Sequence, residues 1–320
     1  MRILGIESSC DETSAAVIDS DGTLRGHVIN SQQEHAAFGG VVPELASRAH
    51  MRTAVSTIRK ALVDSNCDLN QIDGIAVTAG PGLVGSLLVG ISIAKGIALA
   101  GKKKLVGVHH LEGHIFSTLL EHPDFEPPFL TLLVSGGHSE IIFVDTWGTY
   151  EVLGRTRDDA AGEAFDKAAR MLDLLPKSGS LHGGRIIAES AANGNPAAIP
   201  FPRGLSKEDT LDFSFSGLKT ALRTHIDSLS ERERATLLPD IAASYEMAIV
   251  DALVAKAVKA MERREVKKVA LAGGVAANST LRRKLNQEVA ARNGTLCCPS
   301  PIYCTDNAAM IAAVGRYHLM

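Results

Sequence analysis

Two pairs of matching segments, one of each pair in each half of the chain, constrain the fold more than any other feature. Residues 2–22 and 129–145 each read as two apolar runs joined by a polar turn rich in serine or glycine. Residues 73–99 and 266–285 each read as an apolar run, then glycines, then a helical pattern. Hairpins combined with strand–glycine–helix units are typical of mixed α/β sheets. The repetition predicts two related α/β lobes, joined through the proline-rich stretch 121–129.

The remaining periodic segments predict helices, and one stretch predicts a loop. Helical patterns occupy residues 43–65, 159–174, 216–227 and 238–263. The stretch 175–185 has no periodicity and is expected to be a loop.

The composition is that of a folded protein with little net charge. Hydrophobic residues make up 45% of the 320, charged residues 22%, and the formal net charge is -3. Disorder is therefore excluded, and any contact with a nucleic acid must come from a local patch. The apolar stretch 84–100 contains glycines and Lys95, which favours a buried core helix over a membrane span. No leader is evident, and the five cysteines show no CxxC spacing, so we expect reduced thiols and a cytoplasmic protein.

The stretch "VHHLEGH" contains two histidines, His110 and His114, four residues apart. A helix turns about 100° per residue, so the two side chains fall on nearly the same face and could bind one metal ion. Glu112 falls about 200° from His110, on the opposite face. A zincin helix instead has its glutamate directly after the first histidine. The spacing thus predicts a metal site and argues against a peptidase, although two polar histidines on an ordinary helix would look alike.

A third ligand is needed to distinguish these interpretations, and two residues could supply it. Asp306, in "CTDNAAM", precedes an apolar helical pattern, where it could bind a metal or serve as the helix N-cap. His138 is the competing candidate, and the sequence does not choose between them.

Two glycine-containing segments could receive an anion. "VSGGHS" offers backbone N–H groups in a hairpin turn, and "LAGGVAANSTL" opens a helix after a strand. An ordinary tight turn and ordinary helix packing explain the same patterns. Asn278 could bond a ligand or cap its helix, and Asp166 could accept bonds from a ribose or be solvated. No Rossmann or P-loop fingerprint is present.

Taken together, these segments resemble one family, the tRNA threonylcarbamoyladenosine-forming transferases (TsaD, or Kae/Qri-type). The matching motifs run in order from Gly5 to Met310: "LGIESSCDETSAAV", "HAAFGGVVPELASRAH", "AGPGLVGSLLVG", "VHHLEGH", "LLVSGGHSEI", "DDAAGEAFDK", "FSFSGLKTAL", "AGGVAANSTLR" and "CTDNAAM". The resemblance implies an α/β fold of the actin, Hsp70 and sugar-kinase (ASKHA) type, with duplicated mixed sheets and a nucleotide cleft between two lobes. We expect the lobes at 1–112 and 113–305, with a C-terminal helix at 306–320 packing back on the first.

The resemblance also implies an acyltransferase reaction. Members transfer a threonylcarbamoyl group from threonylcarbamoyl-AMP to N6 of adenosine 37 in tRNAs that read codons beginning with A, releasing AMP. By this resemblance His110, His114 and Asp306 hold one divalent metal per subunit, iron, with zinc as the alternative. The implied substrate-binding residues are Leu133, Val134, Ser135, Gly136, Gly137, Asp166, Gly184 and Asn278.

One implied contact falls where this chain departs from the family. "DLLPKSGSLHGGR" lacks the usual tyrosine–proline and carries extra residues. The glycine expected to line the nucleotide pocket therefore aligns with Gly184, and Gly179 is the alternative. No general base is assigned; His138, Asp11 and Glu12 lie in candidate loops.

The implied partners are tRNA, a TsaB-like paralogue of the same fold and a TsaE-like P-loop ATPase, with a homodimer as an alternative assembly and no membrane. Two other functional classes compete. A small-molecule kinase of this fold would use a carboxylate base such as Asp11, and a chaperone-like ATP-binding scaffold would tolerate loss of His114. Tight metal binding through the two histidines would count against the kinase.

Overall fold

The computed structural model describes residues 1–38, 40–175 and 183–320. These residues form two compact units. Unit 1 comprises Met1–Phe125 and Ile302–Met320, and unit 2 comprises residues 126–175 and 183–301. The C-terminal segment thus returns to the first unit. Unit 1 extends past residue 112, where we expected its first segment to end.

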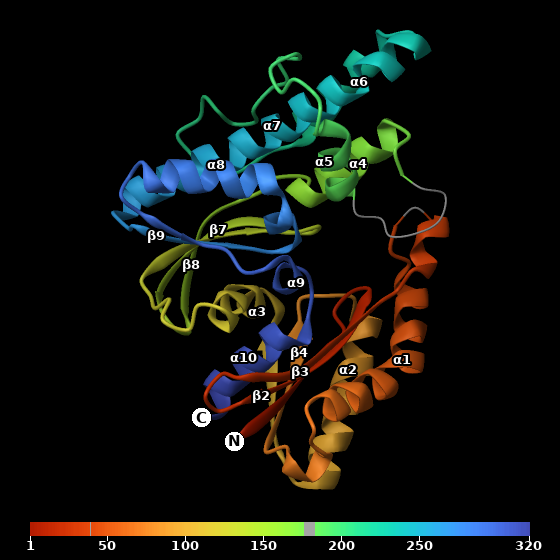
Figure 1. Cartoon of the computed structure of the whole chain (residues 1–320), viewed down its shortest axis with the longest axis vertical. Helices are drawn as coiled ribbons and strands as arrows, with labels where there is room; N and C mark the ends of the chain where they lie inside the picture. Colours follow the sequence, from red (N-terminus) through yellow and green to blue (C-terminus); the bar gives the residue numbers. More distant parts are fainter. Residues whose placement is uncertain (39, 176–182) are drawn as a thin grey trace. The chain divides into compact units, whose positions relative to one another are not determined.

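Unit 1 contains a five-stranded mixed sheet in the order β3-β2-β1-β4-β5 (Figure 1). Its strands are β1 (Arg2–Glu7), β2 (Glu12–Asp19), β3 (Leu24–Ser31), β4 (Gly74–Gly80) and β5 (Lys104–His109). The pairs β1–β2 and β2–β3 are antiparallel, whereas β1–β4 and β4–β5 are parallel. The predicted first hairpin is thus present, extended by a third strand, and the first strand–glycine–helix unit adds a parallel strand beside it.

Alternation along β1 separates the two faces of this sheet. Leu4 and Ile6 pack into a core with helices α1 (Pro43–Asp64) and α2 (Val84–Gly101). Gly5, pointing the other way, lies against α10 (Ala308–Leu319), where an added Cβ would meet the α10 backbone. Because side chains alternate along a strand, Glu7 lies on the α10 face. The short helix α3 (His110–Phe116) follows β5 and also packs on α10.

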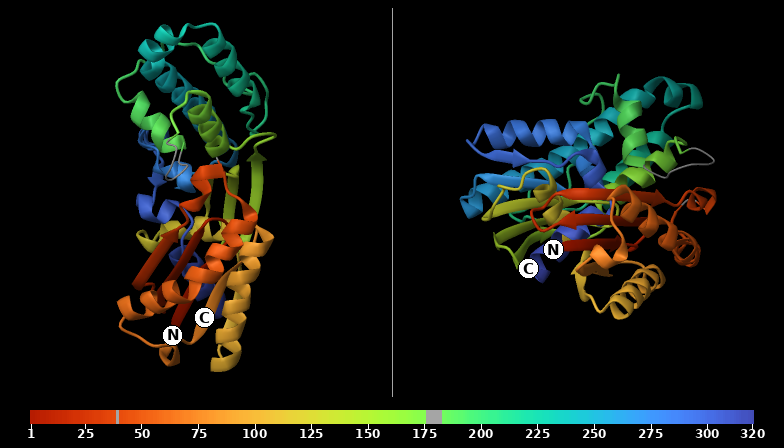
Figure 2. Two further views of the ribbon diagram at one scale, coloured as in Figure 1. Left: turned by 90° about the vertical axis from the view of Figure 1, so that its right-hand side faces the viewer. Right: turned by 60° about the horizontal axis from the view of Figure 1, so that its bottom comes forward.

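Helix α2 is less buried than the sequence suggested. One side, including Leu87, Ala94 and Ala98, is buried, but Leu88 is 57% exposed and Leu99 is 83% exposed. The prediction of a buried core helix was therefore wrong for the outer side. By length and composition alone, among the described residues, α2 is the one helix that could cross a membrane, a test that helices of soluble proteins also pass. It runs beside α1 (Figure 2).

Unit 2 repeats the sheet plan of unit 1, with the order β10-β9-β6-β7-β8. Its strands are β6 (Phe129–Val134), β7 (Ser139–Thr146), β8 (Thr149–Arg155), β9 (Lys268–Ala272) and β10 (Thr295–Cys297). Again an antiparallel meander, β6–β7–β8, adjoins parallel strands, β6–β9–β10. The duplicated mixed sheets predicted from the sequence are confirmed.

The helices of unit 2 follow the predictions closely, with two shifts. They are α4 (Ala161–Met171), α5 (Gly183–Ala191), α6 (Ser216–Asp227), α7 (Glu231–Arg264) and α8 (Ser279–Ala290). Helix α7 begins seven residues before the predicted Leu238, because Ser230 and Glu233 form a capping box and Pro239 is accommodated within the helix. Helix α5 begins at Gly183, so the predicted loop was wrong over 183–185. The remaining short elements are η1 (Glu34–Phe38), η2 (Leu69–Gln71), η3 (Ser117–Leu120), η4 (Gly274–Ala277) and α9 (Pro301–Cys304).

Candidate metal centre and binding loops

Unit 1 brings together the three residues that the family resemblance implied as metal ligands. His110 Nε2 lies 3.4 Å from Asp306 Oδ1, and His114 Nε2 lies 3.2 Å from the same oxygen. One potential ligand atom from each residue falls within 4.8 Å of the others. Two imidazole nitrogens and a carboxylate oxygen converging in this way suit a divalent transition metal. The competing candidate His138 lies in unit 2, outside this group.

Close packing of α3 against α10 produces this convergence. Gly113, one residue before His114, lies where an added Cβ would be 2.9 Å from Ile311 Cδ1 and 3.1 Å from Met310 Cγ. Such spacing leaves no room for a side chain. The glycine thus lets α3 sit directly on the start of α10, two residues after Asp306. The sequence pattern alone does not reveal this role of Gly113.

Asp306 does not act as the helix cap that its position also allowed. Asn307 caps α10, its Oδ1 accepting from Met310 N at 3.0 Å while its Nδ2 donates to Thr305 O at 2.7 Å. Ser14 Oγ on β2 also accepts from Ala308 N at 2.9 Å. These buried bonds fix the turn, and the Asp306 side chain is left to point at the histidines.

The charges at this centre are strongly coupled. Burial by itself would raise the pKa of Asp306, but His110 and His114 hold it well below its usual range. Conversely, burial lowers the pKa of His110, and the carboxylates of Asp306 and Glu7 outweigh that effect and raise it well above normal. Both directions show a site that favours a positive charge beside its carboxylates.

The hydrogen bonding of His114 gives a separate reason to expect a metal at this centre. His114 is fully buried, yet among the described residues neither of its ring nitrogens has a hydrogen-bond partner, although Nε2 is 3.2 Å from Asp306. A ligand nitrogen of His114 lies within 4.8 Å of the ligand atoms of His110 and Asp306. An unsatisfied buried imidazole is costly, and a metal ion would satisfy it. Glu112 instead pairs with His318 on α10 at 3.4 Å, away from the two histidines, as the helix geometry predicted.

Two candidate general bases, Asp11 and Glu12, follow β1 in the same unit. Burial, reinforced by Asp11 and Asp306, raises the pKa of Glu12 well above its ordinary value. A carboxylate with a raised pKa is a stronger base once it is deprotonated, so Glu12 stays a candidate beside Asp11.

In unit 2, the predicted "LVSGG" segment ends β6 and turns into β7. Leu133 and Val134 are buried in β6, whereas Gly136 and Gly137 are exposed. Ser135 N donates to His138 O at 2.8 Å, which closes the turn. No atom among the described residues lies within 4 Å of a Cβ added at either glycine, so their backbone is open to a ligand.

The predicted Asp166 and Gly184 are neighbours. Asp166 on α4 accepts a hydrogen bond from Gly183 N, the first residue of α5, at 2.8 Å. Gly184 follows in the first turn of α5 and faces Phe165. The alternative, Gly179, lies outside the described residues.

Asn278 caps α8, which is one of the two roles that the sequence allows for it. Its Oδ1 accepts from Leu281 N at 2.8 Å, and its Nδ2 donates to Glu246 Oε1 at 2.7 Å. Glu246, a buried carboxylate on α7, also accepts from Thr280 Oγ1 at 3.0 Å. A single acidic residue within a long helix gave no sequence signal of this pairing.

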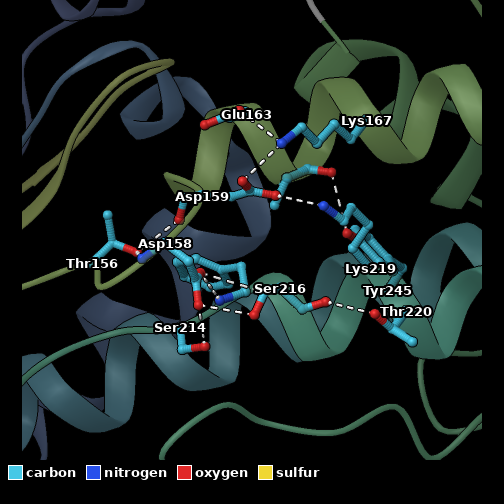
Figure 3. A network of polar contacts seen from close by, with 12 residues as sticks. Thr156, Asp158, Asp159, Glu163, Lys167, Ser214, Ser216, Lys219, Thr220 and Tyr245 are labelled. Carbon is cyan, nitrogen blue, oxygen red and sulfur yellow. Dashed lines mark hydrogen bonds and ion pairs between the residues drawn. The ribbon is translucent and has the colours of Figure 1, made fainter.

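Figure 3 shows that the loop before α4 uses both aspartates of "DDAAGEAFDK". Asp158 accepts from Phe215 N at 2.7 Å and from Ser216 N, the first residue of α6, at 3.2 Å, so it caps α6 from outside that helix. Asp159 pairs with Lys167 at 2.7 Å and lies 3.5 Å from Lys219. The motifs "DDAAGEAFDK" and "FSFSGLK" are thus joined in space, which holds α4 and its Asp166 in place.

Comparison with known proteins decides the family. The model of the tRNA N6-adenosine threonylcarbamoyltransferase (TsaD) family matches residues 23–313. The chain belongs to this family. A relative from Clostridium beijerinckii bearing that name is 48% identical over 99% of this chain and 92% of its own length. Another, from Syntrophus aciditrophicus, is 49% identical with the same coverage.

Solved structures support the fold expected from the family. The chain aligns over 99% of its length with HypF from T. kodakarensis, covering 47% of that chain (TM-score 0.64, 17% identity). It also aligns over 99% with component A of (R)-2-hydroxyglutaryl-CoA dehydratase from Acidaminococcus fermentans, covering 98% of that chain (TM-score 0.58, 13% identity). At such low identity these matches bear on the fold alone. The ASKHA-type fold is confirmed.

Proposed function

We propose that the chain transfers the threonylcarbamoyl group of threonylcarbamoyl-AMP to N6 of adenosine 37 in tRNAs that read codons beginning with A. The observation that carries the proposal is the convergence of His110, His114 and Asp306 in a chain of this family. In the reaction, the adenine amine attacks the carbamoyl carbon. The bond from that carbon to the phosphate oxygen breaks, AMP leaves with the electron pair, and the amine loses a proton.

The metal ligands are His110, His114 and Asp306, and the ion is iron, with zinc as the alternative. Two nitrogens and one oxygen leave further coordination positions for a substrate. A bound divalent ion would supply a Lewis acid beside the donor. The protein's own groups contribute a buried, low-dielectric surrounding and a fixed ligand geometry.

The donor-binding residues are those of unit 2. Open backbone at Gly136 and Gly137 suits N–H contacts to the phosphate or carboxylate of the acyl-adenylate, with Leu133, Val134 and Ser135 forming the rest of that strand end. Asp166 would accept from the ribose and Gly184 would line the nucleotide. Asn278 would reach the adenine end, although both ends of its amide already have protein partners.

The proposed partners are a TsaB-like paralogue and a TsaE-like ATPase, with a homodimer as the alternative. Support for a protein partner comes from α1 and α2, which carry exposed apolar side chains: Met51, Val55, Val63, Val84, Leu88 and Leu99. Apolar surface on adjacent helices is typical of an interface. Because the acceptor is a tRNA, we place the protein in the cytoplasm.

The proposal is tested by single-turnover transfer. Purified protein is mixed with threonylcarbamoyl-AMP and unmodified tRNA, with and without the two partner proteins, and digested tRNA is analysed for the modified nucleoside. A reaction lacking the donor is the control. We expect the nucleoside only when protein and donor are both present. If none forms in any combination while ATP is consumed on a small molecule, the kinase interpretation replaces this one.

A further inference from the structure

We propose that Glu7 is a positioning residue of the metal centre: it fixes the ring of His110 so that Nε2 faces the metal, and with Asp306 it balances the charge of a divalent ion. The inference rests on the proposed metal site. It starts from an observation that the family resemblance does not explain, a fully buried carboxylate at the end of β1.

The Glu7 carboxylate is held in one place by two donors, one from the loop after β1 and one from β4. Oε1 accepts from Ser9 N at 2.5 Å, and Oε2 accepts from Thr78 Oγ1 at 2.6 Å. Thr78 lies on β4, the parallel neighbour of β1, where Ile6 pairs with Val77. Neither Glu7 nor Thr78 is exposed, so the carboxylate cannot swing into water. Its position is set by the sheet.

From this position Glu7 determines which nitrogen of His110 is free. His110 Nδ1 lies 3.2 Å from Glu7 Oε2, while Nε2 points to Asp306. A proton on Nδ1 is therefore stabilised by the carboxylate, and the lone pair stays on Nε2, where a metal would bind. A carboxylate behind a ligating histidine both orients the ring and raises its basicity.

Charge balance leads to the same conclusion. With neutral imidazoles, the fully buried Glu7 and the partly buried Asp306 bring two negative charges to the site, and a divalent ion cancels both. A buried carboxylate without a counter-charge would be costly. Within the described part of the chain, His114 Nδ1 has no hydrogen-bond partner, so no carboxylate there orients that ring. The two histidines are therefore not equivalent, and Glu7 acts on His110 alone.

A second group near His110 Nδ1 supplies the control. Ser9 Oγ lies 3.3 Å from the same nitrogen and could also orient the ring, but it carries no charge. The experiment compares Glu7→Gln, which keeps the shape and loses the charge, with Ser9→Ala and with Glu246→Gln, the same exchange at a buried carboxylate of unit 2. Affinity for Co²⁺ or Zn²⁺ is measured by competition with a chromophoric chelator, and the melting temperature of each metal-free protein is measured alongside.

We expect Glu7→Gln to weaken metal binding by about tenfold to a hundredfold in a protein that still melts cooperatively without metal. Ser9→Ala and Glu246→Gln should stay within about threefold of the wild type, since neither removes the charge behind His110. Affinity within threefold of the wild type in Glu7→Gln, or an equal loss in Ser9→Ala, would overturn the inference.

Two further outcomes are informative. If Glu7→Gln does not fold, Thr78→Val, which removes one donor to Glu7, should weaken binding by about threefold to tenfold, and an unchanged affinity would contradict the proposal. If the wild type binds no metal, the proposed metal site itself fails. Failure of the Glu7 proposal can thus be distinguished from failure of the metal site, and neither test requires an assay of transfer.

Discussion

Replacing Gly5 with alanine should displace α10 and thereby weaken the metal centre. An alanine Cβ at this position would lie 2.8 Å from Ala312 Cβ and 2.7 Å from Ala312 N, and it would also meet Ala308 O. Ordinary contact begins at 3.4 Å, so the 2.7 Å distance to Ala312 N alone requires the helix to retreat by about 0.7 Å. Overpacking of this kind costs about 1–3 kcal/mol.

The same displacement affects Asp306, two residues before α10. Metal–ligand distances tolerate deviations of about 0.2 Å, so a shift of this size should lower metal affinity by about tenfold or more. Urea unfolding gives the stability change, and chelator competition gives the affinity. The matched control is Gly96→Ala on the exposed side of α2, where nothing described lies within 4 Å and the helix should gain up to about 1 kcal/mol. Wild-type metal affinity in a folded Gly5→Ala protein would refute the reasoning.

Three further changes test other parts of the structure. Burial lowers the pKa of His27 from 6.5 to about 4, so stability that is present above pH 6.5 is lost as the pH falls toward 4. Urea titrations at the two pH values should show that His27→Phe removes about 1–3 kcal/mol of this loss. An unchanged pH dependence would exclude His27 as its source. Asp158→Ala removes the cap of α6 and should lower the free energy of unfolding by about 1 kcal/mol. Asp158→Asn keeps an acceptor oxygen and should cost less than half of that. Equal losses would mean that the charge of Asp158 matters rather than capping. Lys256 is 5% exposed and donates to Leu205 O at 2.9 Å and to Thr210 O at 2.7 Å. Lys256→Met should therefore lower the free energy of unfolding by about 1–3 kcal/mol. No change would show that water satisfies the two carbonyls.

Local pattern predicted the elements of this fold well because their signals are local. The hairpin at 129–145 and the helix at 216–227 appear where periodicity placed them. The histidine pair was also visible, because four-residue spacing on a helix is a short-range property. Helix α5 (Gly183–Ala191) was not predicted at all, because no helical period was recognised in that stretch.

Long-range contacts set the limits of the sequence analysis. Asp306 faces His110 and His114 rather than capping α10, because Gly5 and Gly113 let α10 approach both the sheet and α3. Glu7 and Glu246 look like ordinary acids in the sequence, and their partners are about 30 to 100 residues away. The outer side of α2 was mistaken for core because hydrophobicity does not reveal whether a helix face is covered.

The central claim is that His110, His114 and Asp306 form a metal centre that serves transfer to tRNA. Its most direct test measures bound metal per chain and single-turnover transfer side by side, in the wild type and in His114→Ala and Asp306→Ala. The account predicts about one metal per wild-type chain, little in either variant, and a parallel loss of the modified nucleoside. Full metal content without His114, or undiminished transfer by a metal-free variant, would contradict it.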